Sequence, residues 1–177
     1  MVLESVAHAR KRGIMPLAFV RGFGVTCDAH HITAPDPEGR QSARAMRDAV
    51  ERAGMRPVDI NYVNAHGTGT RDNDSMEARA IRQVFGDTLP MVSSTKRATG
   101  HTFGAAGVLE AIVCVQAIRE GIAPVNGGSI HGDPELDLPV ARGESRRMEI
   151  RAAMSTNFAF GGNNTALVIS REAGERT

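Results

Sequence analysis

The sequence has few cysteines, no tryptophan and no excess of charge of either sign. Lysine and arginine total 21 and aspartate and glutamate total 20, so a net charge of +1 provides no general field for binding nucleic acid. The two cysteines, Cys27 and Cys114, lack the short spacing of zinc or redox motifs. Cys27 with His30 and His31 also lacks convergent ligand spacing, so we expect no metal. We expect a reducing, cytoplasmic setting, in which a charged partner is met by a local patch.

Long apolar runs are also absent. No segment approaches the ~20 apolar residues of a membrane-spanning helix, and residues 1–4 lack the start of an export signal. We therefore expect a soluble protein that is not exported and has no membrane partner. No repeat or low-complexity linker divides the 177 residues, and 41% hydrophobic residues suffice for a core. This predicts a single domain over residues 1–177.

Apolar patterning predicts that helices and strands alternate along the chain. Helical spacing occurs at residues 3–11, 41–53, 75–85 and 105–119. Strand-like segments occur at residues 18–25, 60–63, 91–92, 152–160 and 165–170, with a turn at residues 161–164 between the last two. The alternation predicts an α/β layer fold in which helices cover a mixed sheet. Because residues 105–119 carry few charges, we predict a central helix that is buried on most sides.

Three polar, glycine-rich segments each follow an apolar strand, at residues 64–70, 93–107 and 157–164. The loops after strands are where α/β proteins place ligand groups. Within the first segment, His66 considered alone is also compatible with a structural histidine. Gly67 permits backbone conformations closed to other residues, while the hydroxyls of Thr68 and Thr70 can bind an amide or a phosphate, or simply build a threonine-rich turn.

The second segment combines a lysine and a histidine with an acidic residue in an apolar helix. Lys96 precedes His101, and a helix opens nearby, where free amides and positive potential face any anion. Lys96 alone could be a solvated surface residue. Glu110, however, lies about one turn inside the apolar helix, where a carboxylate is costly unless it is paired. We therefore predict that Lys96 and Glu110 form a pair.

The third segment places two aromatic residues beside paired glycines. Phe158 and Phe160 can be core residues, which is the usual role of aromatics in a terminal strand, or one of them can act as a mobile gate. Gly161-Gly162 also invites comparison with a phosphate-binding loop. No Gly-Lys-Ser/Thr pattern accompanies the two glycines, so we disfavour a nucleotide site.

Several long motifs occur in one order along nearly the whole chain. They are Gly22-Phe23-Gly24, Asp28-Ala29-His30-His31-Ile32-Thr33, Val63-Asn64-Ala65-His66-Gly67-Thr68-Gly69-Thr70, Ser93-Ser94-Thr95-Lys96, Thr99-Gly100-His101, Gly104-Ala105-Ala106-Gly107 with Glu110, and Asn157-Phe158-Ala159-Phe160-Gly161-Gly162. Their order and intervals resemble the carboxyl-terminal half of the elongating β-ketoacyl-acyl carrier protein synthases of the thiolase superfamily. The resemblance implies an α-β-α layer that is one half of a duplicated fold, and a homodimer of the complete enzyme.

The resemblance also implies a decarboxylative Claisen condensation in fatty acid or polyketide synthesis. In this family an acyl chain is held on a cysteine, malonyl-acyl carrier protein loses carbon dioxide, and the carbanion attacks the acyl thioester. No tightly bound cofactor is expected, because the phosphopantetheine arm of the acyl carrier protein brings the substrate. Nothing here resembles the segment of the nucleophile, and neither Cys27 nor Cys114 falls in its motif. The expected partners are therefore acyl carrier protein and a cysteine-bearing amino-terminal synthase half.

By this resemblance His66 and His101 are the catalytic pair, whose imidazoles stabilise the enolate oxygen as charge develops on it. Lys96 orders this network through Glu110, and Asp74 and Glu77 match positions that brace the site. The implied substrate contacts are Thr68, Thr70, Thr33, His31, Phe160, Phe158 and Gly161.

By the same resemblance Phe160 is the gate beside the acyl pocket. Two departures from the family pattern lie near it, because Ala159 replaces a glycine and Asn163 replaces a threonine. Arg71 and Arg97 would form a local patch that steers the acidic carrier protein.

Two other functions are weighed against condensation. The missing nucleophile favours a non-catalytic carrier-binding or pocket-shaping subunit, and a thiolase using coenzyme A is disfavoured because paired histidines suit decarboxylation.

Overall fold

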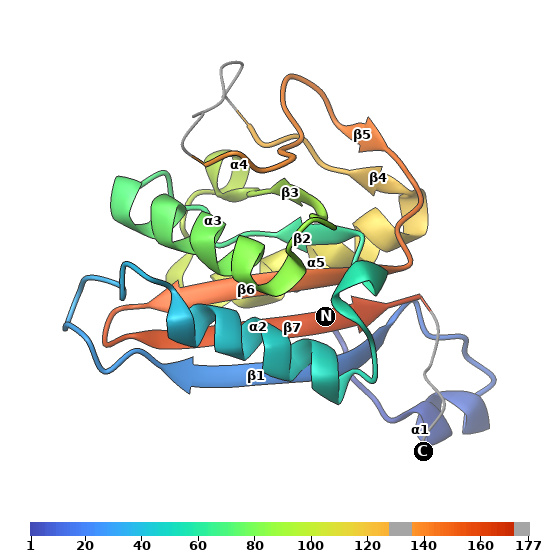
Figure 1. Ribbon diagram of the computed structural model, residues 1–177. Helices are drawn as coiled ribbons and strands as arrows, with labels where there is room; N and C mark the ends of the chain where they lie inside the picture. Colours follow the sequence, from blue (N-terminus) through green and yellow to red (C-terminus); the bar gives the residue numbers. More distant parts are fainter. Residues whose placement is uncertain (128–135, 172–177) are drawn as a thin grey trace.

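A five-stranded mixed sheet forms the middle layer of the protein (Figure 1). The computed structural model describes residues 1–127 and 136–171. The sheet has the order β1-β7-β6-β2-β3, with strands β1 (Phe19–Cys27), β7 (Asn163–Ser170), β6 (Ala152–Ala159), β2 (Tyr62–Asn64) and β3 (Met91–Ser93). Strand β2 runs parallel to β3 and β6, whereas β7 is antiparallel to β1 and β6. The predicted mixed sheet is therefore confirmed.

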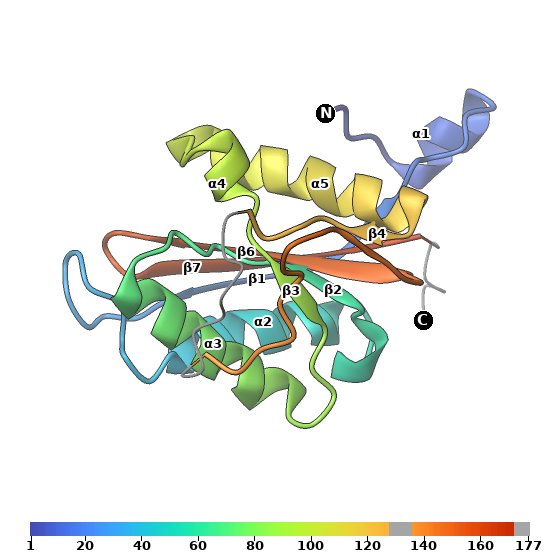
Figure 2. The ribbon, with the colours of Figure 1, turned by 90° about the horizontal axis from the view of Figure 1, so that it is seen from above.

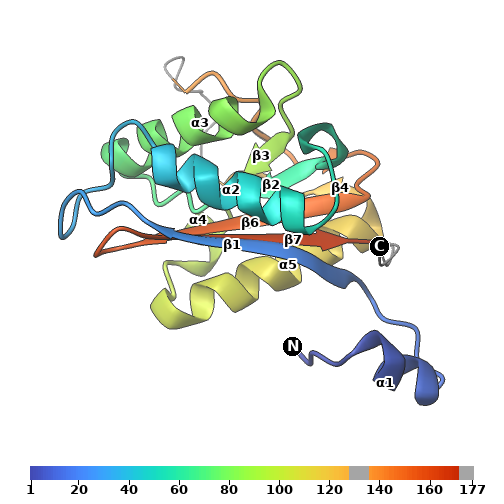
Figure 3. The ribbon, with the colours of Figure 1, turned by 60° about the horizontal axis from the view of Figure 1, so that its bottom comes forward.

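Helices cover both faces of this sheet (Figure 2). Helices α2 (Arg40–Arg52) and α3 (Arg71–Phe85) lie on one face, and α5 (Ala106–Glu120) lies on the other. The short helix α1 (Val6–Lys11) projects from the sheet edge on the same side as α5 (Figure 3). This α-β-α layering confirms the predicted fold class.

The two faces of the sheet carry separate cores, because successive side chains of a strand point to opposite faces. Val63 of β2 packs in the cluster beneath α2 and α3, together with Met46 and Ile81. Tyr62, the preceding residue, packs instead in the cluster beneath α5 with Cys114. Burial on both faces holds β2 rigidly between β6 and β3, and residues 65–70 follow directly from it.

Two glycines in β1 set the distance between the sheet and α2. A Cβ atom on Gly22 would lie 2.2 Å from the carbonyl oxygen of Ala49, and one on Gly24 would lie 1.9 Å from that of Ala45. Both distances are far below van der Waals contact, so only glycine allows this approach. The Gly22-Phe23-Gly24 motif thus serves helix packing.

Helix α5 is buried on its sheet-facing side, where Glu110, Ala111 and Cys114 lie. Its other side is open, and Val108 and Leu109 expose 47% and 37% of their surfaces. The prediction of burial on most sides therefore fails for the described part of this chain, because α2 and α3 pack on the opposite face of the sheet and leave the outer side of α5 uncovered.

Several short elements were not predicted from the sequence. They are η1 (Pro57–Asp59), α4 (Lys96–Thr99), η2 (Phe103–Ala105), β4 (Ile122–Ala123) and β5 (Arg146–Arg147). The first helical turn of α3, residues 71–74, was also missed, because its polar residues carry no apolar periodicity. The predicted turn at residues 161–164 is shorter, since Asn163 and Asn164 already pair with Ala159 and Phe158 in the β6–β7 hairpin.

Candidate active site

The segments that follow β2, β3 and β6 meet at one edge of the sheet. These three strands are mutually parallel, so their carboxyl ends lie together. The resulting cleft has a volume of about 1990 Å³. Of the residues predicted from the sequence, those that line it are His66, His101, Lys96, Asp74, Glu77, Thr68, Thr70, Thr33, Phe158 and Phe160. Residues up to 127 positions apart in sequence, Thr33 and Phe160, thus share one cavity.

His66 is held in this cleft by a buried carboxylate from α3. Its main-chain N–H donates to Oε1 of Glu77 at 2.9 Å, and the N–H of Gly67 donates to Oε2 at 2.9 Å. The hydroxyl of Thr156, in β6, donates to the same Oε1 at 2.7 Å. Glu77 therefore fixes the backbone that carries the imidazole, rather than touching the imidazole itself. Burial raises the pKa of Glu77, and these hydrogen bonds oppose that rise.

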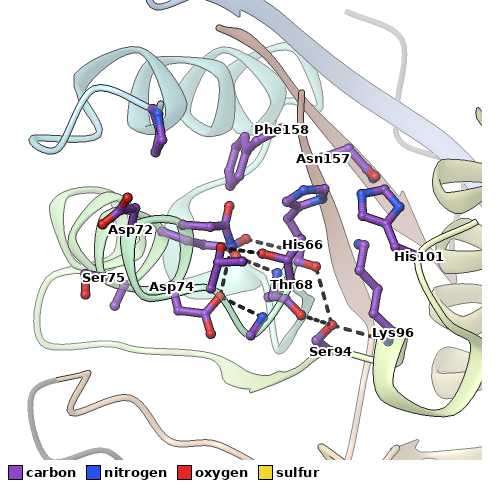
Figure 4. A pocket seen from close by; sticks show the side chains of 18 of the residues that line it. His66, Thr68, Asp72, Asp74, Ser75, Ser94, Lys96, His101, Asn157 and Phe158 are labelled. Atoms are coloured by element: carbon purple, nitrogen blue, oxygen red, sulfur yellow. Dashed lines mark hydrogen bonds between the residues drawn. The ribbon is translucent and has the colours of Figure 1, made fainter. Parts of the chain in front are cut away.

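The imidazoles of His66 and His101 meet edge to face, with ring centroids 5.4 Å apart and ring planes at 84° (Figure 4). On its other side His66 contacts the ring of Phe158, at a centroid distance of 5.6 Å. Nδ1 of His101 accepts a hydrogen bond from the main-chain N–H of Phe103 at 3.1 Å. An accepting Nδ1 carries no proton, so neutral His101 carries its proton on Nε2, which can donate to a substrate oxygen.

The environment of His66 strongly favours the neutral imidazole. Burial is the main cause, and the positive charge of Lys96 and the neighbouring His101 add to it. Together they lower the pKa of His66 from 6.5 to about 3. His66 is therefore a neutral hydrogen-bonding group near pH 7 and not a cationic acid.

Lys96 lies on α4 and forms a buried ion pair with Glu110 of α5, which confirms the predicted pairing. The two side chains expose 5% and 3% of their surfaces. Glu110 does not line the cleft, so it reaches the histidines only through Lys96. The ion pair fixes the position of the Lys96 ammonium group, and its positive charge acts on the neighbouring His66.

The threonine loop after His66 is braced from α3. The hydroxyls of Thr68 and Thr70 lie 2.9 Å apart and share a hydrogen bond. Oδ1 of Asp74, in α3, accepts a hydrogen bond from the N–H of Gly69 at 3.3 Å, which restrains the loop. Thr68 is partly buried and Thr70 is exposed, so both hydroxyls are accessible from the cleft.

The loop after β1 and the hairpin turn after β6 pack against each other and together form part of the wall of the cleft. The N–H of Gly161 donates to the carbonyl of Ile32 at 2.6 Å. Thr33 and Phe160 line the cleft, and Phe160 exposes 77% of its surface. His31 and Gly161 do not line it, and Nδ1 of His31 instead accepts the N–H groups of Thr33 and Ala34. The structure therefore places His31 in a local turn outside the cleft, where its imidazole holds the backbone of Thr33.

Two residues that shape the site were missed in the sequence. The sequence pattern predicts only that Thr156 belongs to an apolar strand, although its hydroxyl donates a hydrogen bond to Glu77. Ser94 donates from Oγ to the carbonyl of Gly67 at 2.9 Å and so joins the loops after β2 and β3. The sequence signal that could have identified Thr156 and Ser94 is a polar residue near the carboxyl end of a buried strand.

Neither cysteine lines the cleft. Cys114 is completely buried on the sheet-facing side of α5, and burial raises the pKa of its thiol to about 12. Cys27 is exposed at the end of β1, where its sulfur lies 3.4 Å from the carbonyl oxygen of Gly161. Within residues 1–127 and 136–171, no group of three or more histidine, cysteine or acidic residues could hold a metal ion.

With this geometry in place, the chain can be compared with known proteins. The family model described as "Beta-ketoacyl synthase, C-terminal domain" matches residues 17–129. This chain belongs to the β-ketoacyl synthase family. Among relatives, 3-oxoacyl-[acyl-carrier-protein] synthase 2 of Coxiella burnetii is 44% identical over 173 residues, and nodulation protein E of Rhizobium meliloti is 46% identical over 172 residues. They cover 97% and 96% of this chain.

Solved structures agree with this assignment. The ishigamide ketosynthase/chain length factor matches with a TM-score of 0.92 and 37% identity over 96% of this chain. A β-ketoacyl synthase from Burkholderia phymatum matches with a TM-score of 0.90 and 38% identity, also over 96% of the chain. This chain spans about 42% of the length of the two sequence relatives, and 42% and 41% of the two solved chains. Among the described residues, no helix is both long and apolar enough to span a membrane.

Proposed function

We propose that this chain, as one carboxyl-terminal domain over residues 1–177, supplies the histidine, histidine and lysine half of a decarboxylative condensing site. The carrying observation is the edge-to-face pair of His66 and His101, 5.4 Å apart in one cleft with the buried Lys96. The substrates proposed are an acyl thioester on a cysteine of another chain segment and malonyl-acyl carrier protein. No tightly bound cofactor is needed, because the carrier's phosphopantetheine arm delivers the malonyl group.

In the first step, the bond between the malonyl carboxylate and its α-carbon breaks and carbon dioxide leaves. The electron pair of that bond moves into the thioester, which becomes an enolate with charge on its oxygen. We propose that neutral His66 and the Nε2–H of His101 hydrogen-bond this oxygen, with bonds that strengthen as charge develops; the low pKa of His66 and the accepting Nδ1 of His101 support this. Lys96 contributes a positive charge near His66 while Glu110 holds its side chain.

In the second step, the enolate carbon attacks the carbonyl carbon of the acyl thioester. A carbon–carbon bond forms, the carbon–sulfur bond to the cysteine breaks, and the thiolate leaves with its electron pair. Thr68 and Thr70 are proposed to hold the amide-rich arm of the carrier. Thr33 lines the same cleft and is proposed to lie near this arm, and Phe158 and Phe160 line it beside the proposed acyl pocket. His31 and Gly161 would act indirectly through the loops that they hold.

A cysteine-bearing amino-terminal half is the proposed partner, and the α5 side of the protein is its docking surface. The outer side of α5 exposes Val108 and Leu109. The chain around α1, on the same side of the sheet, exposes Leu3, Ile14 and Met15 by at least 50% each (Figures 2 and 3). Apolar side chains gathered on one side favour a protein interface over solvent.

A non-catalytic carrier-binding or pocket-shaping subunit is the second candidate. It is favoured by one observation, that neither cysteine lines the cleft. The pairing of two imidazoles with a buried lysine counts against it, because shaping a pocket requires none of these groups. Carrier binding and pathway output that survive loss of both imidazoles would support this second candidate.

The deciding experiment reconstitutes the chain with the cysteine-bearing amino-terminal half of a relative and measures condensation with malonyl-acyl carrier protein. His66→Ala and His101→Ala should each reduce kcat by about 10²–10³, the usual cost of losing an oxyanion donor. His30→Ala, which changes an exposed histidine outside the cleft, is the matched control and should leave kcat unchanged. Equal activity of the His66→Ala complex and the unmodified complex would refute the proposal.

Carrier recognition is tested separately by its dependence on salt. Arg71 and Arg97 both line the cleft and are exposed, so they can attract an acidic carrier protein. Its association rate should fall as salt rises, and Arg97→Glu should lower it further at low salt. Arg44→Glu, an equal charge change on the outer side of α2, should have a smaller effect. An association rate that does not change with salt would exclude this mode of steering.

A further inference from the structure

The row of rings in the cleft continues beyond the two histidines to Phe103. The ring of Phe103 stacks on the imidazole of His101, with centroids 5.1 Å apart and planes at 26°. Phe158, His66, His101 and Phe103 therefore form a series of successive contacts, with centroid distances between 5.1 and 5.6 Å. Phe158 ends the row on the partly buried side, and Phe103 ends it on the exposed side.

Burial in this chain does not account for the position of the Phe103 ring. The side chain exposes 83% of its surface, whereas a phenylalanine of the core such as Phe85 exposes 3%. The backbone of Phe103 also has a φ of +49°, a region that bulky residues rarely adopt and that a glycine would adopt without strain. The observed contact of this ring is with His101, two residues earlier in the chain.

His101 lies where regular structure does not fix its ring. It stands between α4, which ends at Thr99, and η2, which begins at Phe103. The main-chain hydrogen bond from Phe103 holds only the Nδ1 atom, about which the imidazole can still tilt. A second contact over the face of the ring removes that freedom.

We propose that the Phe103 side chain is a positioning residue, which stacks on the imidazole of His101 and holds its plane edge to face with His66. This inference rests on the proposed function of the two histidines. The main-chain N–H of Phe103 selects the tautomer, and the aromatic ring sets the orientation in which Nε2–H is presented. Aromatic stacking in an offset geometry with centroids about 5 Å apart is favourable, and it is specific in angle.

The test uses proton NMR of the imidazole groups in the full chain. Protons over the face of an aromatic ring resonate upfield, so the carbon-bound ring protons of His101 should be shifted upfield. Phe103→Leu should abolish that shift, while Phe103→Tyr should retain it. Both variants keep the main-chain N–H and a side chain at the same positive φ, so they differ only in the aromatic ring. The signals of His31, held by its own turn, report whether each variant is folded.

The same variants are then assayed in the reconstituted complex. Phe103→Leu should lower kcat roughly ten- to a hundredfold with little change in the KM for malonyl-acyl carrier protein, because an imidazole is misplaced while binding is kept. Phe103→Tyr should restore kcat. Unchanged His101 signals in Phe103→Leu would overturn the proposal, and a raised KM with unchanged kcat would make Phe103 a substrate contact instead. If His101→Ala itself leaves condensation intact, the proposed function fails while the NMR result still decides the stacking.

Discussion

Lys96 Nζ and Glu110 Oε1 form an ion pair that joins α4 to α5, and both side chains are at least 95% buried. The pair connects the segment just before His101 to the helix that covers one face of the sheet. The charge of Lys96 also contributes to the low pKa of His66. The packing of α5 and the electrostatics of the histidines are therefore linked through one contact.

Breaking this pair from one side should strongly destabilise the protein. Lys96→Met leaves the Glu110 carboxylate buried without its partner, and losses of about 3–5 kcal/mol are usual for such a change. Lys96→Met combined with Glu110→Leu should lose less, because no uncompensated charge is left behind. Urea unfolding of the single and double variants measures both values.

The surface ion pair of Arg146 and Glu144 provides the control for this prediction. Its nitrogen and oxygen atoms lie 2.9 Å apart, but its side chains are 48% and 76% exposed. Arg146→Ala should change stability little, because water screens and replaces exposed pairs. A double variant as unstable as Lys96→Met would contradict the account based on buried charge.

Gly67 and Gly69 offer a matched comparison within the threonine loop. Both have positive φ, +39° and +77°, but a Cβ atom on Gly67 would lie 2.5 Å from Cβ of Ser94, while one on Gly69 meets no atom within 4 Å. Gly69→Ala should cost about 1–2 kcal/mol from backbone strain alone. Gly67→Ala should cost more and should displace His66, whose backbone is adjacent.

Thermal or urea unfolding gives the two stabilities, and the His66 imidazole signals in NMR report displacement. Gly67→Ala should move those signals, whereas Gly69→Ala should leave them close to their original positions. Equal effects of the two substitutions would show that strain, and not the contact with Ser94, governs this loop.

The fold and much of the site could be predicted because their signals are local. A glutamate inside an apolar helix predicts a partner, and Lys96 is that partner. Glu77 is different, because α3 carries several acidic residues and only the packed structure shows that this one holds the backbone of His66 and Gly67. The positive φ of Phe103 has no sequence signal at all, since it depends on how α4 and η2 meet.

The stability of the protein should fall below neutral pH because of His66. Its pKa is about 3 in the folded protein and 6.5 in an unfolded chain, so the unfolded state binds more protons between these values. This contribution to stability is complete above pH 6.5 and is lost as the pH falls toward 3, with a slope of at most about 1.4 kcal/mol per pH unit. Burial of Glu77 acts in the opposite direction, since a raised pKa loses stability as pH rises.

Replacing His66 isolates its share of this pH dependence. Urea unfolding at several pH values between 4 and 7 should give a shallower dependence for His66→Gln than for the unmodified chain, while the contribution of Glu77 stays common to both. Parallel curves for the two proteins would mean that His66 titrates alike in the folded and unfolded states.

The two cysteines should react differently, and neither should carry an acyl group. Cys27 is exposed, so iodoacetamide should modify it in the native protein. Cys114 is completely buried with a thiol pKa raised to about 12, so it should react only after unfolding. Intact mass measured before and after denaturation counts the alkylated sites, and Cys27→Ala should abolish native labelling.

The same mass measurement, after incubation with an acyl-carrier thioester, asks where the nucleophile lies, because a covalent intermediate adds the mass of the acyl group. We expect an unchanged mass, since neither sulfur lines the cleft that holds His66 and His101. Adding a cysteine-bearing amino-terminal half should then produce an acyl adduct on that half alone. An adduct on this chain that Cys27→Ala removes would instead place the nucleophile beside the turn at Gly161, and the proposal of a shared site would have to be abandoned.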